Sequence, residues 1–329
     1  MKSLNVGIIG CGNMGRRHAR AYQYHAPRTH LVAAYDLYPE TARKFADQFE
    51  CQIEPSLELL LQRQDIDAVS ICTIETAHVE PTLVAAKNGK HILLEKPMAM
   101  NMEEALKMKQ AVDRAGIKLM VGHLYRFDHR CIEAKRLIDS GQIGRLVSID
   151  GRFHGTPAQQ DRIRDVEMPL IAFRGCHVID LMRWFTGSEL SRVYSESIDG
   201  TLRAMGYHSE DAAYCLLRFA NGVLGSIEVT AQAPASHPTA GLAELVLTGT
   251  KGMIQLDLAQ PWLTLANDKG YMLSQGTQKD LWFREEIGAF ADYVLDDGPN
   301  VASAVDAIAA LEFASAAVES AKSHQPIFM

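Results

Sequence analysis

The feature that most constrains the fold is a glycine-rich turn near the start of the chain. A short apolar run, Leu4–Ile9, leads into Gly10-Cys11-Gly12-Asn13-Met14-Gly15, and a stretch with helical character follows to about Tyr24. A strand that passes through Gly-x-Gly-x-x-Gly into a helix is typical of the first unit of a dinucleotide-binding sheet. The first glycine allows the tight turn, the second admits a pyrophosphate, and the third lets helix and strand pack closely. The alternative, a purely structural glycine-rich turn, is disfavoured by this spacing and context.

An acidic residue after the next apolar run supports the same interpretation. Asp36 follows Leu31–Tyr35 and comes roughly 20 residues after Gly15, where an acid binds the adenosine ribose hydroxyls. A carboxylate at this position repels a 2′-phosphate, so NAD is expected in preference to NADP. Arg16 and Arg17 are candidates to offset that repulsion.

The first third of the chain alternates strand and helix signals, whereas the rest follows another pattern. Uninterrupted apolar strands separated by helices predict a parallel sheet covered on both faces. After about Gly122, turn sequences at Asn221-Gly222, Gly249–Gly252 and Asn267–Gly270 separate pairs of strands and predict three hairpins. The predicted fold is therefore α/β. A Rossmann doubly wound domain spans residues 1–123, and an α+β domain with a large, mostly antiparallel open sheet spans residues 124–329.

Composition excludes several classes of protein. The 329 residues include 33 basic and 40 acidic ones, a net charge of −7, and the basic residues form no long run. A nucleic-acid partner is therefore not expected. The longest charge-free stretch, Val229–Ala243, is too short for a bilayer and contains two prolines. Six scattered cysteines and the lack of a recognisable signal peptide favour free thiols and a cytoplasmic protein. No metal or membrane partner is expected either.

Two groups of residues are candidates for chemistry. Glu95-Lys96-Pro97 comes directly after the apolar strand His91–Leu94. Charged residues at the carboxyl end of a buried parallel strand face the crevice where such sheets bind ligands, although most loop lysines are simply solvated. His177 lies near the start of a predicted helix and shares a face with Asp180. A lone histidine is more often structural than catalytic, so this second signal is weak by itself.

The order of the motifs carries a family resemblance. The sequence contains the following elements in succession: Gly10–Gly15 with Arg17-His18-Ala19, His78, Glu95-Lys96-Pro97, Gly122-His123-x-x-Arg126-Phe127, Gly175-x-His177-x-x-Asp180 and the hairpin Arg218-Phe219-x-Asn221-Gly222. Each motif is common, but the ordered set is specific. Over nearly its whole length, the chain resembles the glucose–fructose oxidoreductase / inositol dehydrogenase / rhizopine-catabolism (Gfo/Idh/MocA) oxidoreductase family.

The resemblance implies an activity and a set of site residues. It implies NAD(P)-dependent hydride transfer at a hydroxyl-bearing carbon of a sugar, cyclitol or sugar derivative, with Lys96 and His177 as catalytic residues. It also implies a homodimer or homotetramer, because the open sheet of such proteins packs against a sister subunit. The implied cofactor-binding residues are Gly10, Gly12, Asn13, Met14, Gly15, Asp36, Thr73, Ile74, His78, Glu95 and Lys96. The implied substrate-facing residues are Arg126, His154, Arg174 and Asp180.

The chain departs from the family pattern at three places. Phe173 stands where the family usually has an aspartate, four residues before the histidine. The segment Glu167–Leu170 replaces a usual Gly-Gly pair, and Ile74 replaces a usual proline. Without that aspartate, Asp180 or a loop acid is expected to orient His177. Arg174, together with Arg162 and Arg164 upstream, is a candidate to recognise an anionic substrate, and a solvated basic loop is the alternative.

Three functions are compatible with these motifs. The first is a sugar or cyclitol dehydrogenase. The second is a glycosidase or lyase that oxidises its substrate transiently with tightly held NAD, and the third is a non-catalytic dinucleotide or sugar sensor. The retained Lys96 and His177 favour an enzyme. Net accumulation of NADH distinguishes the first function from the second.

Overall fold

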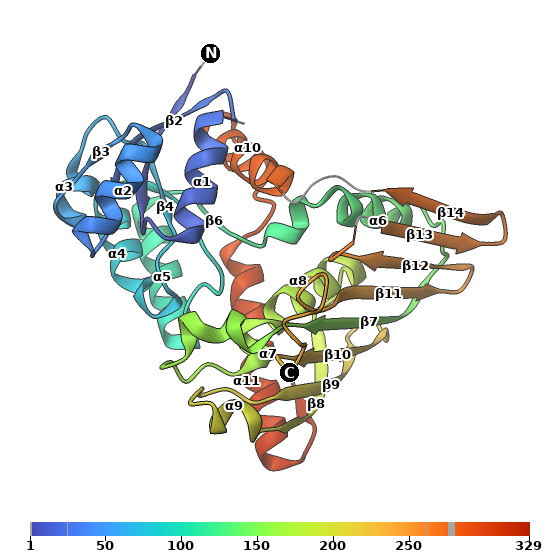
Figure 1. The fold of residues 1–329 in the computed structure, drawn as a ribbon. Coiled ribbons are helices and arrows are strands. Elements are labelled where there is room, and N and C mark those ends of the chain that lie inside the picture. The colour runs from blue at the N-terminus through green and yellow to red at the C-terminus, as the bar shows by residue number, and fades with distance from the viewer. Residues whose placement is uncertain (1, 25, 261, 276–279) are drawn as a thin grey trace. The chain divides into compact units, whose positions relative to one another are not determined.

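The computed structural model describes residues 2–24, 26–260, 262–275 and 280–329 and divides the chain into two compact units (Figure 1). The first unit consists of Met1–Phe127 and Lys279–Ile308, and the second of Asp128–Gln278 and Ala309–Met329. The sequence predicts a division between residues 123 and 124, with all later residues in the second domain. In the structure, a segment from near the C-terminus belongs to the first unit.

A six-stranded parallel sheet forms the centre of the first unit, in the order β3-β2-β1-β4-β5-β6. Its strands are β1 (Leu4–Ile9), β2 (Thr29–Tyr35), β3 (Gln52–Ile53), β4 (Ala68–Ile71), β5 (His91–Leu94) and β6 (Leu119–Val121). The accompanying helices are α1 (Asn13–Tyr24), α2 (Pro39–Phe49), α3 (Leu57–Gln62), η1 (Glu75–Ala77), α4 (Val79–Lys87), α5 (Met102–Ala115) and η2 (Leu124–Phe127). The strand order reverses between β1 and β4, which confirms the predicted doubly wound sheet.

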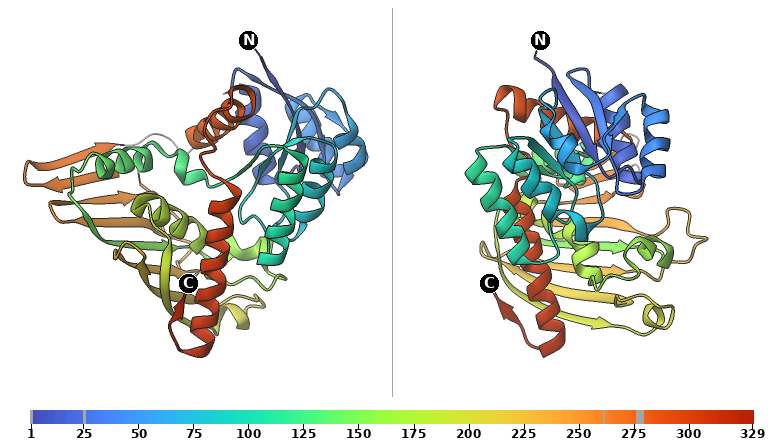
Figure 2. Two further views of the ribbon diagram at one scale, coloured as in Figure 1. Left: turned by 180° about the vertical axis from the view of Figure 1, so that it is seen from behind. Right: turned by 90° about the vertical axis from the view of Figure 1, so that its left-hand side faces the viewer.

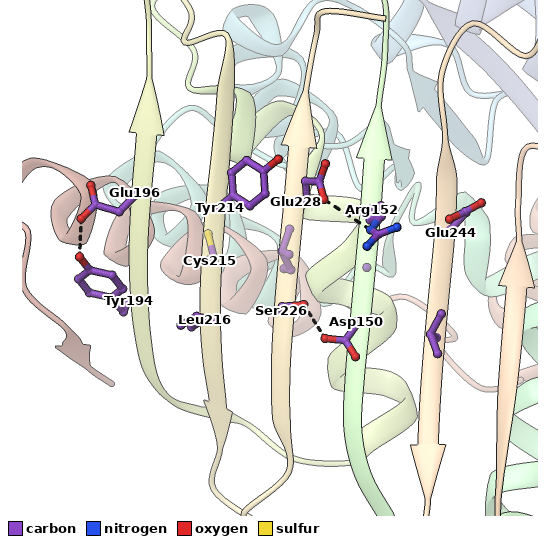
Figure 3. A pocket seen from close by; sticks show the side chains of 13 residues that line it. Asp150, Arg152, Tyr194, Glu196, Tyr214, Cys215, Leu216, Ser226, Glu228 and Glu244 are labelled. Carbon is purple, nitrogen blue, oxygen red and sulfur yellow. Dashed lines mark hydrogen bonds and ion pairs between the residues drawn. The ribbon is translucent and has the colours of Figure 1, made fainter. Parts of the chain in front are cut away.

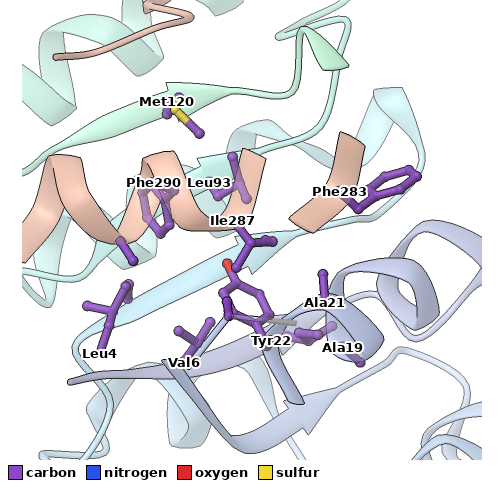
Figure 4. Close-up of a cluster of buried hydrophobic side chains, with 14 of the residues drawn as sticks. Leu4, Val6, Ala19, Ala21, Tyr22, Leu93, Met120, Phe283, Ile287 and Phe290 are labelled. Carbon is purple, nitrogen blue, oxygen red and sulfur yellow. The ribbon is translucent and has the colours of Figure 1, made fainter. Parts of the chain in front are cut away.

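Helix α10 (Asp280–Asp296) completes the core of this unit. Phe283, Ile287 and Phe290 recur at helical spacing, and each is at most 4% exposed. Figure 4 shows these side chains among those of β1 and α1, including Val6 and Tyr22. Full burial of side chains of this size contributes about 1.5–3 kcal/mol each, which explains why the segment returns to the first unit.

The second unit contains a nine-stranded sheet in the order β14-β13-β12-β11-β7-β10-β9-β8-β15. Among the described strands, only β7 and β10 pair in parallel, so the prediction of a mostly antiparallel sheet is confirmed. The strands are β7 (Leu146–His154), β8 (Leu190–Ile198), β9 (Ala212–Phe219), β10 (Leu224–Thr230), β11 (Ala243–Gly249), β12 (Gly252–Asp257), β13 (Trp262–Asn267), β14 (Gly270–Gln275) and β15 (Ile327–Phe328). All three predicted hairpins are present.

Helices cover one face of this sheet (Figure 2). They include α6 (His129–Asp139), α7 (Leu170–Phe173), α8 (Gly175–Thr186) and the later part of α11 (Ala304–Ser323). Two short helices, η3 (Pro157–Ile163) and α9 (Thr201–Ala204), belong to the same unit. Gly151 of β7 lies so close to α8 that a Cβ on it would come within 2.4 Å of Val178. Among the described residues, no helix has the length and hydropathy needed to cross a bilayer.

The other face of the sheet, which we call the open face, is shown in Figure 3. Along β9, Ala213, Cys215 and Leu217 are buried, whereas Tyr214 and Leu216 on the open face are 55% and 64% exposed. The open face bears a groove of ≈ 540 Å³. The charged residues that line the groove are Asp150, Arg152, Glu196, Glu228 and Glu244.

Candidate cofactor and active site

A cavity of ≈ 480 Å³ lies at the point in the first unit where the strand order reverses. In a doubly wound sheet this is the place where a dinucleotide binds. Five of the residues expected to bind the cofactor line the cavity: Gly10, Gly12, Asp36, Thr73 and Ile74.

The three motif glycines have different surroundings. Gly10 has a φ of +94°, and a Cβ there would lie 2.7 Å from the backbone of Cys72. A Cβ on Gly15 would lie 2.0 Å from the carbonyl oxygen of Gly10, so only glycine lets α1 start this close to β1. A Cβ on Gly12 would meet nothing within 4 Å. The open space above Gly12 is the cradle that a pyrophosphate needs, so the turn fits the dinucleotide.

Asp36 is fixed at the edge of the cavity by two backbone amides. Its carboxylate accepts hydrogen bonds from the amides of Cys11 at 2.7 Å and Tyr38 at 2.9 Å. Glu58 and Glu80 line the same cavity. Such an acidic cavity disfavours a 2′-phosphate.

The two arginines proposed to offset this charge contact other groups. Arg16 donates to the side chain of Gln48, and its guanidinium lies 6.0 Å from the ring centroid of Phe45. The guanidinium of Arg17 lies 5.4 Å from the ring centroid of Phe283. Both contacts lie within the first unit and associate the arginines with α2 and α10.

Three exposed apolar side chains also line the cavity. Leu37, Tyr38 and Ile74 are 73%, 68% and 51% exposed. Large apolar surfaces in a nucleotide cavity are suited to packing against an adenine ring. Sequence reasoning missed Leu37 and Tyr38, although their position directly after Asp36 was an available signal.

Glu95, which the family resemblance assigns to the cofactor, is buried, with 6% of the residue exposed. Its role toward the cofactor stays a prediction. One carboxylate oxygen lies 3.1 Å from Nε2 of His18, and the other accepts a hydrogen bond from the backbone amide of Lys96 at 3.2 Å. Glu95 therefore acts on the Lys96 backbone from inside the first unit.

His78 is likewise turned inward. It is 1% exposed, with Nδ1 3.0 Å from the carbonyl oxygen of Pro97 and Nε2 3.3 Å from that of Thr73. Burial lowers the pKa of His78, so the imidazole is neutral near pH 7. The structure thus places this expected cofactor residue between the loop after β4 and the loop that carries Lys96.

Arg126, an expected substrate residue, binds the segment before α11. Its Nη1 donates to the carbonyl oxygen of Val301 at 2.8 Å, and its Nη2 lies 3.1 Å from the carboxylate of Asp306. Burial favours the neutral form of Asp306, but the charge of Arg126 and hydrogen bonds from Ser303 and Arg126 outweigh it and lower the pKa of Asp306 to about 2. A role of Arg126 toward substrate stays a prediction.

In the second unit, α7 and α8 carry the other catalytic candidates. His177 is partly exposed and stacks on Phe153, with the ring centroids 6.5 Å apart. Asp180 follows about one helical turn later and is 1% exposed. Phe173 is 7% exposed, so an apolar side chain packs where the family usually has an aspartate.

Arg174 is held by neutral amides. Its Nη2 donates to the amide oxygen of Gln159 at 2.6 Å, and its guanidinium lies against Gly155, where a Cβ would come within 2.0 Å. With its amide oxygen turned toward Arg174, the buried Gln160 accepts from Nε at 3.1 Å. By contrast, Arg164 pairs with Asp161 of η3, and its guanidinium lies over the ring of Tyr207. These contacts connect η3 to the segment that follows α9. Arg174 therefore stays the candidate residue for recognising an anionic substrate, whereas the contacts of Arg164 are structural.

His154 lies at the end of β7 and faces the open side of the sheet. Its Nε2 is 2.7 Å from the carboxylate of Glu228 on β10, which also approaches Arg152 at 3.4 Å. Phe153, the preceding residue, is the one that stacks on His177. In the structure His154 contacts Glu228, and its contact with substrate stays a prediction.

These features define a two-unit, dinucleotide-dependent oxidoreductase. The first unit provides the parallel sheet, the glycine cradle and the ribose-binding acid, and the second provides a broad antiparallel sheet with a histidine on a covering helix. Residues 4–123 match the model of the oxidoreductase family with an NAD-binding Rossmann fold, and residues 131–255 match the GFO/IDH/MocA C-terminal domain. The chain belongs to the GFO/IDH/MocA oxidoreductase family.

Individual relatives extend this result. The chain is similar to the levoglucosan dehydrogenase of Pseudarthrobacter phenanthrenivorans, at 32% identity over 77% of this chain and 73% of the relative. It is 28% identical to the scyllo-inositol 2-dehydrogenase (NAD(+)) of Bacillus subtilis, over 98% of this chain and 96% of the relative. It is also 28% identical to the 2,7-anhydro-N-acetylneuraminate hydratase of Escherichia coli, over 78% and 68%.

A solved structure of levoglucosan dehydrogenase in complex with NADH and levoglucosan is similar over 100% of this chain and 99% of that one. The TM-score is 0.90, and the sequence identity is 26%. Together with the family match, these relatives show that the chain is an NAD-dependent dehydrogenase acting on CH–OH groups.

Proposed function

We propose that this protein transfers a hydride between NAD and a hydroxyl-bearing carbon of a sugar, cyclitol or related sugar derivative, and that it prefers NAD to NADP. The observation that carries the proposal is the placement of Lys96. It follows β5 at the carboxyl edge of the dinucleotide-binding sheet, and the residues on both sides of it are bound from within the first unit. The substrates named for the levoglucosan and scyllo-inositol dehydrogenases support the substrate class.

The proposed reaction gives Lys96 and His177 separate tasks. When bound, NAD supplies the hydride acceptor, and the hydroxyl proton of the substrate must then pass to a base. Histidine suits this role because its ordinary pKa lies near neutrality. The Lys96 ammonium donates a hydrogen bond to the same oxygen and stabilises the negative charge that develops there.

Asp180 takes over the orientation of His177 in this proposal. Phe173 has no polar atom with which to hold an imidazole, whereas Asp180 is buried on the same helix about one turn beyond the histidine. Residues three apart on a helix are neighbours on one face. A carboxylate beside a general base stabilises the imidazolium that forms during proton transfer.

A substrate panel tests the function. Sugars, cyclitols and uronates are incubated with NAD and with NADP, and reduction is followed by absorbance at the nicotinamide band. On the best substrate, Lys96→Ala and His177→Ala are each expected to lower kcat by roughly 10²–10⁴-fold, the usual contribution of a proton-transfer group, while NAD affinity is retained. Lys107→Ala, at an exposed position on α5, is the matched control. Near-normal kcat in both site variants would disprove the assignment.

A second candidate is transient oxidation by tightly held NAD, followed by elimination or hydration and re-reduction. The similarity to a 2,7-anhydro-N-acetylneuraminate hydratase favours including it. The same panel separates the two functions if product formation is measured alongside absorbance. Substrate turnover without accumulation of NADH supports the second candidate and contradicts the first.

A further inference from the structure

A cluster of buried polar side chains lies behind Lys96 in the first unit. We call it the His18 cluster, and it consists of His18 and Tyr22 of α1, Ser70 of β4, Glu95 after β5 and Glu286 of α10. None of these five residues is more than 6% exposed. Burial of this many polar groups is costly unless they are hydrogen-bonded, so their partners indicate what the cluster does.

The cluster forms a continuous chain of contacts that ends at Lys96. Nδ1 of His18 lies 3.2 Å from the hydroxyl of Ser70, which lies 2.7 Å from that of Tyr22. On the other side of the ring, Nε2 of His18 lies 3.1 Å from Glu95. The second carboxylate oxygen of Glu95 accepts a hydrogen bond from the backbone amide of Lys96. The orientation of His18 thus fixes Glu95, and Glu95 fixes the backbone of Lys96.

Glu286 places a second carboxyl group next to the same imidazole. Its Oε2 lies 3.9 Å from Nε2 of His18. Burial, together with the charge of Glu95, raises the pKa of Glu286 well above its ordinary value. Burial alone would raise the pKa of Glu95 too, but the hydrogen bond and charge of His18 and the charge of Lys96 lower it. The surroundings of the cluster therefore favour the ionised form of Glu95 and the protonated form of Glu286.

Among the described residues, the titratable groups that interact with Glu286 include His18 and Tyr22 on α1, Cys72 after β4 and Glu95 after β5. Burial raises the pKa of Tyr22 and of Cys72, and the charge of Glu286 acts in the same direction on both. Neither Tyr22 nor Cys72 supplies a positive charge, so ionised Glu286 would repel Glu95 across a neutral His18.

His78 fixes the other end of the same loop. It contacts the carbonyl oxygens of Pro97 and Met98 at 3.0 and 3.3 Å. Lys96 is therefore held through its own amide on one side and through the two following carbonyls on the other. A lysine on a loop held in this way keeps its position while its ammonium exchanges hydrogen bonds with substrate.

We propose that Glu95 and His18 are positioning residues that hold Lys96 for the reaction, and that Glu286 limits this arrangement at alkaline pH. The inference rests on the proposed function, because it requires Lys96 to act at the reacting oxygen. As the pH rises, Glu286 loses its proton, the two carboxylates repel each other, and the hydrogen bond that the Lys96 amide donates to Glu95 weakens.

Hydrogen exchange and kinetics test the positioning role together. In Glu95→Gln, exchange of the backbone amides of residues 95–98 is expected to accelerate, and kcat is expected to fall about 10–100-fold, the scale of a small misplacement, with little change in KM or NAD affinity. His18→Ala has the same effect, and His18→Gln, which keeps a polar group toward Glu95, recovers part of kcat. Unchanged kcat in Glu95→Gln, with or without faster exchange, overturns the proposal.

The role of Glu286 is tested by the pH profile of kcat. The ratio of kcat at about pH 9.5 to that at about pH 7 is expected to be higher in Glu286→Gln than in the wild type, because the variant has no carboxyl proton to lose as the pH rises. Glu286→Met removes the same proton with a different shape, so agreement of the two variants excludes a packing effect. If the ratio of the two kcat values is the same in the wild type and in a folded Glu286 variant, the role proposed for Glu286 is wrong. A wild type without turnover on any substrate refutes the proposed function instead, and the exchange experiment is unaffected by that result.

Discussion

At the scale of single residues, the motif glycines give the sharpest contrast. Gly15 has no room for a Cβ because the carbonyl of Gly10 would be 2.0 Å away, whereas Gly12 faces open space. Gly15→Ala is therefore expected to destabilise the first unit and to lower the unfolding temperature. Gly12→Ala is expected to leave the unfolding temperature of the free protein unchanged but to weaken NAD binding, because its methyl group occupies the pyrophosphate cradle.

Calorimetry of the free protein and titration with NAD distinguish the two glycine effects. Each variant serves as the control for the other, since the chemical change is the same. An unfolding temperature lowered equally in both variants, or NAD affinity unchanged in Gly12→Ala, would contradict the roles assigned to them.

Asp36 is expected to set the preference for NAD. Its carboxylate is held by two backbone amides in a cavity that also contains Glu58 and Glu80. Asp36→Ser keeps a hydrogen-bonding group and removes the charge. The ratio of kcat/KM for NAD to kcat/KM for NADP should therefore decrease. Asp47→Ser, on the neighbouring helix α2, is the control. A wild type that binds NADP more tightly than NAD would show that a basic neighbour overrides Asp36.

Single residues also show the limit of prediction from sequence. Gly10, Gly12 and Asp36 were predictable because the dinucleotide motif fixes them by local spacing. The family resemblance implies that Glu95 and His78 bind the cofactor, and that role stays a prediction. Their contacts with His18 and with the Pro97 carbonyl join parts of the chain that are distant in sequence. No local pattern records which way such a side chain turns.

At the scale of elements, turn chemistry predicted local structure well, but not tertiary placement. The Asn221-Gly222 hairpin forms as predicted. The side chains of Ser56 and Asn101 cap α3 and α5 by accepting hydrogen bonds from the amides of Leu59 and Glu104. Helix α10 shows the limit, because its apolar spacing predicts a buried face but not that the first unit buries it. Strand β8 was missed, since its exposed half reads as polar and it depends on β9 for pairing.

The ion pair between η2 and α11 yields a prediction on stability. Because the pKa of Asp306 is lowered to about 2 in the folded protein, its charge stabilises the fold above pH ~4, and this contribution is lost as the pH falls toward about 2. Asp306→Asn is expected to lower the free energy of unfolding by about 2 kcal/mol near neutral pH. The difference from the wild type should shrink between about pH 4 and the lowest pH at which the protein stays folded.

Urea unfolding at a series of pH values measures this difference. Asp113→Asn removes an exposed pair with Lys109 on α5 and is expected to cost less than about 1 kcal/mol. A difference for Asp306→Asn that stays constant down to low pH would mean that the carboxylate charge is not the stabilising feature.

At the scale of the whole molecule, the open face of the second sheet is the feature that the other scales leave unexplained. Tyr214 and Leu216 of β9 are more than half exposed on this face, and the charged residues around the groove include both acids and Arg152. Exposed apolar side chains rimmed by polar ones mark interaction sites. In a two-fold dimer, the apolar strip formed by Tyr214 and Leu216 would pack against the same strip of a second copy of the chain. Arg152 would then be able to pair with acidic residues of that second copy.

We therefore expect a homodimer or homotetramer that uses the open face. Leu216→Glu places a charge in the centre of the apolar strip, where association would have to bury it, so this variant should sediment and scatter light as a smaller particle than the wild type. Leu59→Glu is the matched control, because Leu59 is also about half exposed but lies on α3 of the first unit. If the wild type is monomeric at working concentration, the prediction of assembly is wrong. If it is oligomeric and Leu216→Glu leaves its size unchanged, the subunits associate through another surface and the open face needs a different partner.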